Sequence, residues 1–94
     1  MYFLEVVKTV YKAFRKLEKK DSNQMKEINE KIQQILENPH QFKPLKYPMQ
    51  HMRRVHIGSF VLAYDIDEQR KIVTIRRYEH HDEAYKWIKT YQNH

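Results

Sequence analysis

Three strand-like runs joined by two short turns constrain the fold of this chain more than any other stretch. They cover residues 52–57, 60–66 and 71–78. Gly58-Ser59 forms the first turn and residues 67–70 form the second, and connections this short join antiparallel neighbours. The middle run is apolar on both faces, as expected for the central strand of a sheet. The pattern therefore predicts a three-stranded antiparallel meander.

The outer runs of this meander are apolar on one face only, because side chains along a strand alternate between faces. Val55 and Ile57 in the first run, and Val73 and Ile75 in the third, form the predicted core face. The opposite face is predicted to carry Met52, Arg54, His56, Val61, Thr74, Arg76 and Tyr78. We expect this second face to be exposed, basic and concave, and to be the working surface.

Two helices are predicted before the strands, over residues 8–20 and 22–37. Apolar residues recur in them at helical spacing. Asp21 and Gln24 fit a capping box at the start of the second helix, and Asn38-Pro39 ends it. The short link between the helices predicts an antiparallel pair, packed on the core face of the sheet.

The remaining segments are less regular. Residues 2–6 fit either a strand or the start of the first helix. Residues 39–50 contain all three prolines and read as an ordered connection, which we expect Phe42 and Leu45 to anchor to the core. Asp82 is predicted to cap a final helix that extends through Tyr91. The fold class is therefore α+β.

Composition restricts the functional classes. A chain of 94 residues with 40% hydrophobic content fits one domain, residues 1–94. It has no cysteine, no apolar run near the ~20 residues of a membrane span and no signal-peptide pattern, so we expect a soluble cytoplasmic protein with no membrane partner. The net charge is +6, and residues 43–56 contain no acid. This patch favours a polyanion or an acidic protein as partner.

The order of these elements resembles the RelE/ParE superfamily of toxins from bacterial and archaeal toxin–antitoxin pairs. Three stretches carry the resemblance: PLK (44–46), RRVHIGSFVLAYDID (53–67) and HHDEAY (80–85). The similarity extends over almost the whole chain, and residues 2–17 line up with the first strand and first helix of the family. The resemblance therefore implies a RelE-like fold, with an N-terminal strand added to the antiparallel sheet, the helix pair on one face and a C-terminal helix.

Members of the RelE type are ribosome-dependent endoribonucleases that cut mRNA and are silenced by a small antitoxin. The resemblance thus implies the ribosome, mRNA and a RelB-like antitoxin as partners, the last in a toxin–antitoxin hetero-oligomer. By position it implies catalytic roles for Arg54, His56, His80, His81 and Tyr85, and we add Arg76 as a further phosphate ligand because of its guanidinium. The basic character of Lys43, Lys46, Arg53 and Arg77 predicts RNA-binding roles for these residues. Where the family often has Arg, three residues after the Gly turn, this chain has Val61, so one phosphate-binding cation is missing.

The residue types suit RNA cleavage by the neighbouring 2′-hydroxyl, which needs a base, an acid and fixed positive charge. Histidine serves either proton role, and arginine binds phosphate in a bidentate manner. Because Arg76 and Arg77 alternate along a strand, we expect only one of them to line the site, with Arg77 at its rim. Tyr64 and Trp87 are expected in the core.

Other interpretations stay open at this point. His80 and His81 followed by two acids also fit a plain strand-to-helix turn. No third or fourth ligand stands at a helpful spacing from the two histidines, so we expect no metal or other cofactor. The missing Arg favours a ParE-like toxin that inhibits DNA gyrase without cleaving RNA. A basic sheet face would also suit a nucleic-acid-binding domain without toxicity.

Overall fold

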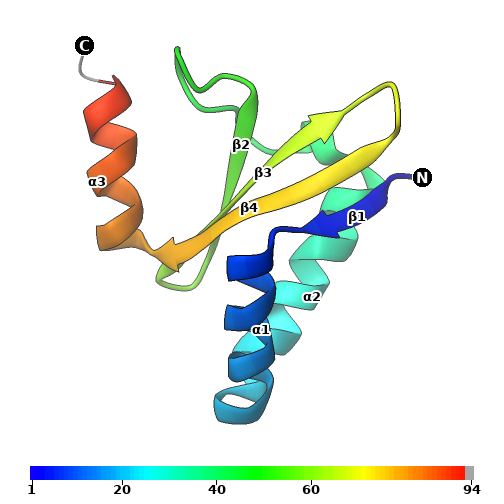
Figure 1. Cartoon of the computed structure of the whole chain (residues 1–94), viewed down its shortest axis with the longest axis vertical. Helices are drawn as coiled ribbons and strands as arrows, with labels where there is room; N and C mark the ends of the chain where they lie inside the picture. The colour runs from blue at the N-terminus through cyan, green and yellow to red at the C-terminus, as the bar shows by residue number, and fades with distance from the viewer. Residues whose placement is uncertain (93–94) are drawn as a thin grey trace.

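The structure, a computed structural model, describes the backbone of residues 1–92 and the side chains of residues 1–88. Its elements follow the predicted order (Figure 1). They are β1 (Phe3–Val6), α1 (Lys8–Lys20), α2 (Ser22–Glu37), the short 3-10 helix η1 (Pro39–Gln41), β2 (Met52–Ile57), β3 (Phe60–Asp67), β4 (Ile72–His80) and α3 (His81–Gln92). The ambiguous N-terminal segment is thus a strand, and α3 begins one residue before the predicted cap.

The four strands form one sheet in the order β1-β4-β3-β2. The meander β2-β3-β4 is antiparallel, as predicted. β1 joins this antiparallel sheet as expected but is parallel to β4, with Phe3 opposite Ile72 and Val6 opposite Ile75, so the four-stranded sheet is mixed. The connection from β1 to β4 contains the helix pair, β2 and β3, and a parallel pair needs a long connection of this kind.

The helix pair packs on one face of the sheet, as predicted (Figure 1). Its apolar stripes and the inward side chains of the strands form the first core, which contains Val10, Phe14, Met25, Ile28, Ile32, Ile35, Val55, Ile57, Leu62, Tyr64, Val73 and Ile75. Tyr64 is fully buried, as expected, and its hydroxyl donates to the carbonyl of Pro39 at 2.5 Å. Burial raises the pKa of Tyr64 to about 12, so this hydroxyl keeps its proton.

The capping box between α1 and α2 is only half formed. The Asp21 carboxylate accepts the backbone N–H of Gln24 at 3.1 Å. The Gln24 amide does not return to Asp21 and donates to the Tyr78 hydroxyl instead. The predicted reciprocal bond is therefore wrong, because the Gln24 side chain ties α2 to the sheet.

A β-bulge in β4 changes the face on which several residues lie. Ala63 pairs with Arg77, but Tyr64 pairs with Ile75, so Arg76 is an extra residue in β4. Tyr78 consequently packs in the first core against Phe14, with ring centroids 5.4 Å apart. Its predicted place beside Thr74 on the second face is wrong, since strict alternation fails at the bulge.

The second face of the sheet is covered in its centre. α3 lies across it, on the side opposite the helix pair (Figure 1). A second core forms there from Leu45, Met52, Val61, Ala63, Ala84 and Ile88. Val61 is only 2% exposed, so the predicted open position of this residue is wrong. Leu45 anchors the connection as expected, and Phe42 packs on the first core.

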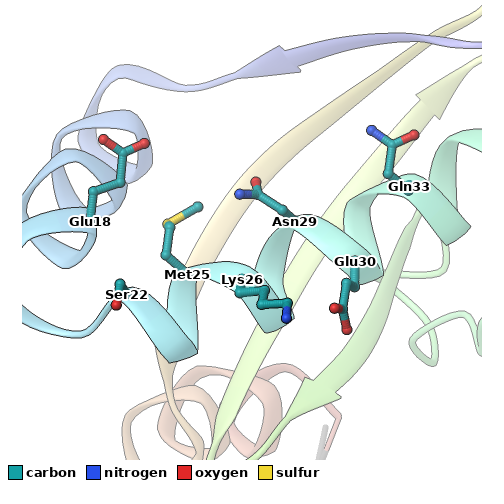
Figure 2. Close-up of a pocket in the computed structure, with 7 residues that line it drawn as sticks. All are labelled: Glu18, Ser22, Met25, Lys26, Asn29, Glu30 and Gln33. Carbon is teal, nitrogen blue, oxygen red and sulfur yellow. The ribbon is translucent and has the colours of Figure 1, made fainter.

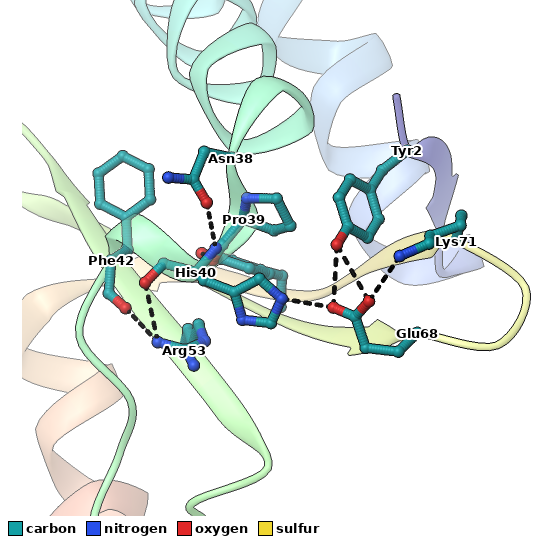
Figure 3. Close-up of polar contacts among 9 residues, drawn as sticks. Tyr2, Asn38, Pro39, His40, Phe42, Arg53, Glu68 and Lys71 are labelled. Carbon is teal, nitrogen blue, oxygen red and sulfur yellow. Dashed lines mark hydrogen bonds and ion pairs between the residues drawn. The ribbon is translucent and has the colours of Figure 1, made fainter.

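A polar network joins the N-terminus to the β3–β4 turn and to the segment after α2 (Figure 3). The Glu68 carboxylate accepts hydrogen bonds from the Lys71 ammonium and the Tyr2 hydroxyl, each at 2.9 Å, and contacts the His40 imidazole. Lys71, then His40 and Tyr2, lower the pKa of Glu68 to about 2. None of the helices within residues 1–92 is long and apolar enough to cross a membrane.

Candidate active site at the β4–α3 junction

The junction of β4 and α3 gathers three of the predicted site residues. The rings of His80 and His81 have centroids 4.4 Å apart, and the ring of Tyr85, one turn along α3, lies edge-on to His81 at 6.1 Å. Each of these side chains is partly exposed. Two imidazoles and a phenol are therefore open to a ligand at one end of the sheet.

His81 is held in place by the β2–β3 turn. Its backbone N–H donates to the carbonyl of Ser59 at 2.8 Å, and its Nδ1 lies 3.2 Å from the same oxygen. A carbonyl only accepts, so Nδ1 carries a proton and the neutral ring has its lone pair on Nε2. Nε2 lies 3.2 Å from Oδ1 of Asp82.

His80 is oriented by the start of α3. Its Nδ1 accepts the backbone N–H of Asp82 at 3.2 Å, so the neutral ring carries its proton on Nε2. The expectation that Asp82 caps the helix is wrong, because α3 begins at His81 and the His80 imidazole satisfies an N-terminal donor. The two neighbouring histidines thus present opposite functions at Nε2, a donor on His80 and an acceptor on His81.

Arg54 and His56 lie on β2, on the same face as α3. They pair with Ala63 and Val61, respectively, both of which belong to the second core. Within the part of the chain that the structure describes, the side chains of Arg54 and His56 form no hydrogen bond and no ion pair. Arg54 is partly exposed and His56 is exposed, so a phosphate can reach both side chains from solvent.

Arg76 and Arg77 lie together on this second face, and the expectation that only one of them lines it is wrong because of the bulge. Both line a hollow of about 680 Å³, together with Pro48, Met49, His51, Met52, Asp65 and Trp87. Each of the two guanidinium groups is paired with a carboxylate. Arg76 Nε is 2.8 Å from Asp65 Oδ2, and Arg77 Nε is 3.2 Å from Glu79 Oε1.

Trp87 completes this arrangement. The Arg77 guanidinium lies 4.6 Å from the ring centre of Trp87, and the indole N–H donates to Glu79 at 3.2 Å. We refer to Arg77, Glu79 and Trp87 as the α3 clasp. Trp87 is partly buried against the second core, which agrees with its predicted place in the core, whereas the sequence predicts no role for Glu79. The bulge that turns Arg77 toward α3 leaves no clear signal in the sequence.

The other predicted RNA-binding residues are dispersed. Arg53 points to the opposite face, where its guanidinium donates to the carbonyls of Phe42 at 2.6 Å and His40 at 3.3 Å (Figure 3). Lys43 and Lys46 are exposed on the segment that runs beside β2. These two lysines lie beside the start of β2, whereas Ile57, at its other end, pairs with Phe60, the partner of His80. Arg53 holds the connection in place.

A second hollow, of about 460 Å³, lies on the helix layer (Figure 2). It is lined by Glu18, Ser22, Met25, Lys26, Asn29, Glu30 and Gln33. It shares no residue with the β4–α3 junction, and its charged groups are two acids and one lysine. It offers no proton-transfer pair of the kind found at the junction.

Comparison with known proteins identifies relatives along the length of the chain. The family model described as "ParE toxin of type II toxin-antitoxin system, parDE" matches residues 4–85. An uncharacterised protein of Methanosarcina mazei is 48% identical over 86 residues, covering 90% of this chain and 100% of the relative. "Putative toxin RelE4" of Methanocaldococcus jannaschii is 38% identical over 94 residues, covering 99% of this chain and 100% of the relative.

The fold is also found in solved structures. The toxin in the crystal structure of the intact E. coli RelBE toxin–antitoxin complex superposes with a TM-score of 0.73 at 21% identity. The match covers 85% of this chain and 96% of that one. At this level of identity the similarity concerns the fold alone.

Proposed function

The chain belongs to the RelE/ParE family of toxins of type II toxin–antitoxin systems, and from that premise we propose that it is an endoribonuclease that cuts mRNA on the ribosome. The observation that carries this proposal is the complementary pair of histidines, His80 and His81, beside Tyr85 at the β4–α3 junction. Cleavage through the 2′-hydroxyl requires one group that takes a proton and another that gives one.

The hydrogen bonds of the two histidines support an assignment of roles. His81 has its lone pair on Nε2 and would take the proton of the 2′-hydroxyl. The Asp82 carboxylate, 3.2 Å from the same Nε2, would move aside for the hydroxyl, and its negative charge would stabilise the imidazolium that forms. His80 has its proton on Nε2 and would give it to the departing 5′-oxygen. Tyr85 would stack on a neighbouring base.

Arg54 is the best candidate for the phosphate ligand. Its guanidinium forms no ion pair with the described side chains, whereas Arg76 is already paired with Asp65. Phosphate binding by Arg54 would therefore cost no existing salt bridge. His56, exposed on the same face of β2, would add a second positive group when protonated. The ribosome would supply much of the orientation of the mRNA.

The test is cleavage of a defined mRNA on ribosomes by purified protein. We expect His81→Ala and Arg54→Ala each to reduce the rate about a hundredfold, a typical loss for a proton-transfer group or an electrostatic stabiliser. Tyr85→Phe should reduce it less, because the ring remains available for stacking. Arg15→Ala, which removes one positive charge from exposed α1, is the matched control and should cleave like the wild type. Equal rates in all variants would refute the assignment.

A ParE-like mechanism, inhibition of DNA gyrase without cleavage, is the second candidate. The family model that matches bears the ParE description, and the charges of Arg76 and Arg77 are balanced by Asp65 and Glu79. Induction of the chain in cells separates the two functions. A fall in translation before DNA synthesis supports the endoribonuclease, and an arrest of DNA synthesis first supports the gyrase inhibitor.

We also propose a RelB-like antitoxin as the partner. The E. coli relative was solved in complex with its antitoxin RelB, and this chain carries a net charge of +6. An antitoxin segment with acidic residues would fit the basic surface around Arg54, Lys43 and Lys46. Its association rate should fall as salt rises, because salt screens attraction between exposed charges. An association rate that does not depend on salt would exclude this placement.

A further inference from the structure

Three potential metal ligands converge at the β4–α3 junction. One ligand atom from each of His80, His81 and Asp82 can be chosen so that all lie within 4.8 Å of one another. The closest approach is 3.2 Å, between His81 Nε2 and Asp82 Oδ1, and His80 Nδ1 is 3.6 Å from Asp82 Oδ2. Two nitrogen or oxygen ligands of one tetrahedral Zn²⁺ lie roughly 3.4 Å apart. The separations of both histidines from the Asp82 carboxylate are close to this value, and His80 Nδ1 would exchange its hydrogen bond from the Asp82 N–H for the ion.

The hydrogen bond from His81 to the Ser59 carbonyl favours the binding of a cation between His81 and Asp82. Because His81 Nδ1 donates to the Ser59 carbonyl, the lone pair of the neutral ring on Nε2 faces the Asp82 oxygen. Two acceptors in contact repel unless a proton or a metal ion lies between them. A carbonyl on the far nitrogen is also the usual partner of a metal-binding histidine, since it fixes the ring and the tautomer.

The change from strand to helix explains how three consecutive residues share one site. Side chains of neighbouring strand residues point to opposite faces, but His80 is the last residue of β4 and His81 is the first of α3. The chain turns between them, and the rings come to lie side by side. The third ligand that sequence spacing did not offer is therefore the residue next to His81.

We propose that His80, His81 and Asp82 bind a divalent transition metal ion of the Zn²⁺ class, with water in the remaining positions. Two imidazoles and one carboxylate suit Zn²⁺, Ni²⁺ or Cu²⁺ better than Mg²⁺ or Ca²⁺, which prefer oxygen. The three side chains are 42%, 44% and 73% exposed, so an ion reaches them directly from solvent. If the proposed endoribonuclease function is right, the same ion would occupy Nε2 of His81, the atom that takes the proton, and inhibit cleavage.

Calorimetric titration of the tag-free chain with zinc chloride tests the site without reference to activity. We expect one ion per chain, and affinity reduced tenfold or more in Asp82→Asn and in His81→Gln. Glu83→Gln is the matched control. It removes the same charge from the same first turn of α3 but lies outside the cluster, and it should bind zinc as the wild type does. His51→Gln, an exposed histidine elsewhere, should also leave affinity unchanged.

Two results would overturn the proposal. No heat at millimolar zinc would mean that His81 and Asp82 form only an ion pair. Equal losses in Asp82→Asn and Glu83→Gln would mean that zinc senses the charge of the helix terminus and not a ligand. A chain that binds zinc but cuts no mRNA would refute the proposed function and leave the metal site standing, so the two failures are distinguishable.

Discussion

The burial of Val61 changes the effect that we expect from a cation at this position. The family resemblance suggests that an arginine at position 61 would raise cleavage. The Val61 side chain, however, packs in the second core with Ala84 and Ile88. We expect Val61→Arg to lower the free energy of unfolding by about 3 kcal/mol or more, because the larger side chain overpacks the core and buries an unpaired charge. Urea unfolding measures this loss, with Val61→Ala as a reference that costs roughly 2 kcal/mol. A stable and more active Val61→Arg would show that α3 leaves this position readily.

Arg54 and Arg76 differ in their ion pairing, so we expect their substitutions to differ in effect. Arg54 has no ion pair with the described side chains, and Arg76 is 2.8 Å from Asp65. We expect Arg54→Ala to lower kcat/KM at least tenfold more than Arg76→Ala. Asp65→Asn, which frees Arg76, should raise affinity for RNA. Equal losses in the two arginine variants would contradict this order.

At the scale of elements, the sequence predicts most of what the structure contains. The helix pair, the meander and the terminal helix follow from periodicity and turn residues, because each depends on neighbours close in the chain. The direction of β1 and the bulge at Arg76 do not follow, because both depend on pairing between distant strands. The sequence predicts the histidines and Tyr85 as site residues, and the structure brings their rings together, whereas the proposed role of Asp82 depends on where α3 begins.

We expect the α3 clasp to stabilise α3 more than the other elements. Trp87→Phe keeps a ring beneath Arg77 but removes the N–H that donates to Glu79. A lost hydrogen bond costs on the order of 1 kcal/mol, so amide exchange in α3 should be about fivefold faster. Hydrogen-exchange mass spectrometry measures this directly. Exchange in α2 should not change, and a uniform rise in every element would show that the clasp supports the whole fold and not α3 in particular.

At the scale of the whole molecule, Glu68 links segments that are distant in sequence (Figure 3). Its folded pKa is about 2, below the ordinary value of 4.5, so its contribution to stability is complete above pH 4.5 and is lost as pH falls toward 2. We expect Glu68→Gln to be less stable than the wild type at pH 6, with the difference shrinking as pH falls. Urea unfolding at pH 6, 4 and 3 tests this prediction. A constant difference over that range would exclude ionisation of Glu68 as its cause.

The parallel pairing of β1 with β4 also has a consequence for the synthesis of this protein. Phe3 is translated before both helices of the pair and two other strands, and its partner Ile72 is translated after them. Contacts between such distant positions form late, because the intervening chain must first be brought together. The β4–α3 junction forms later still, because it needs the last residue of β4 and the first turn of α3. During synthesis the candidate active site can therefore form only after all four strands of the sheet have been translated.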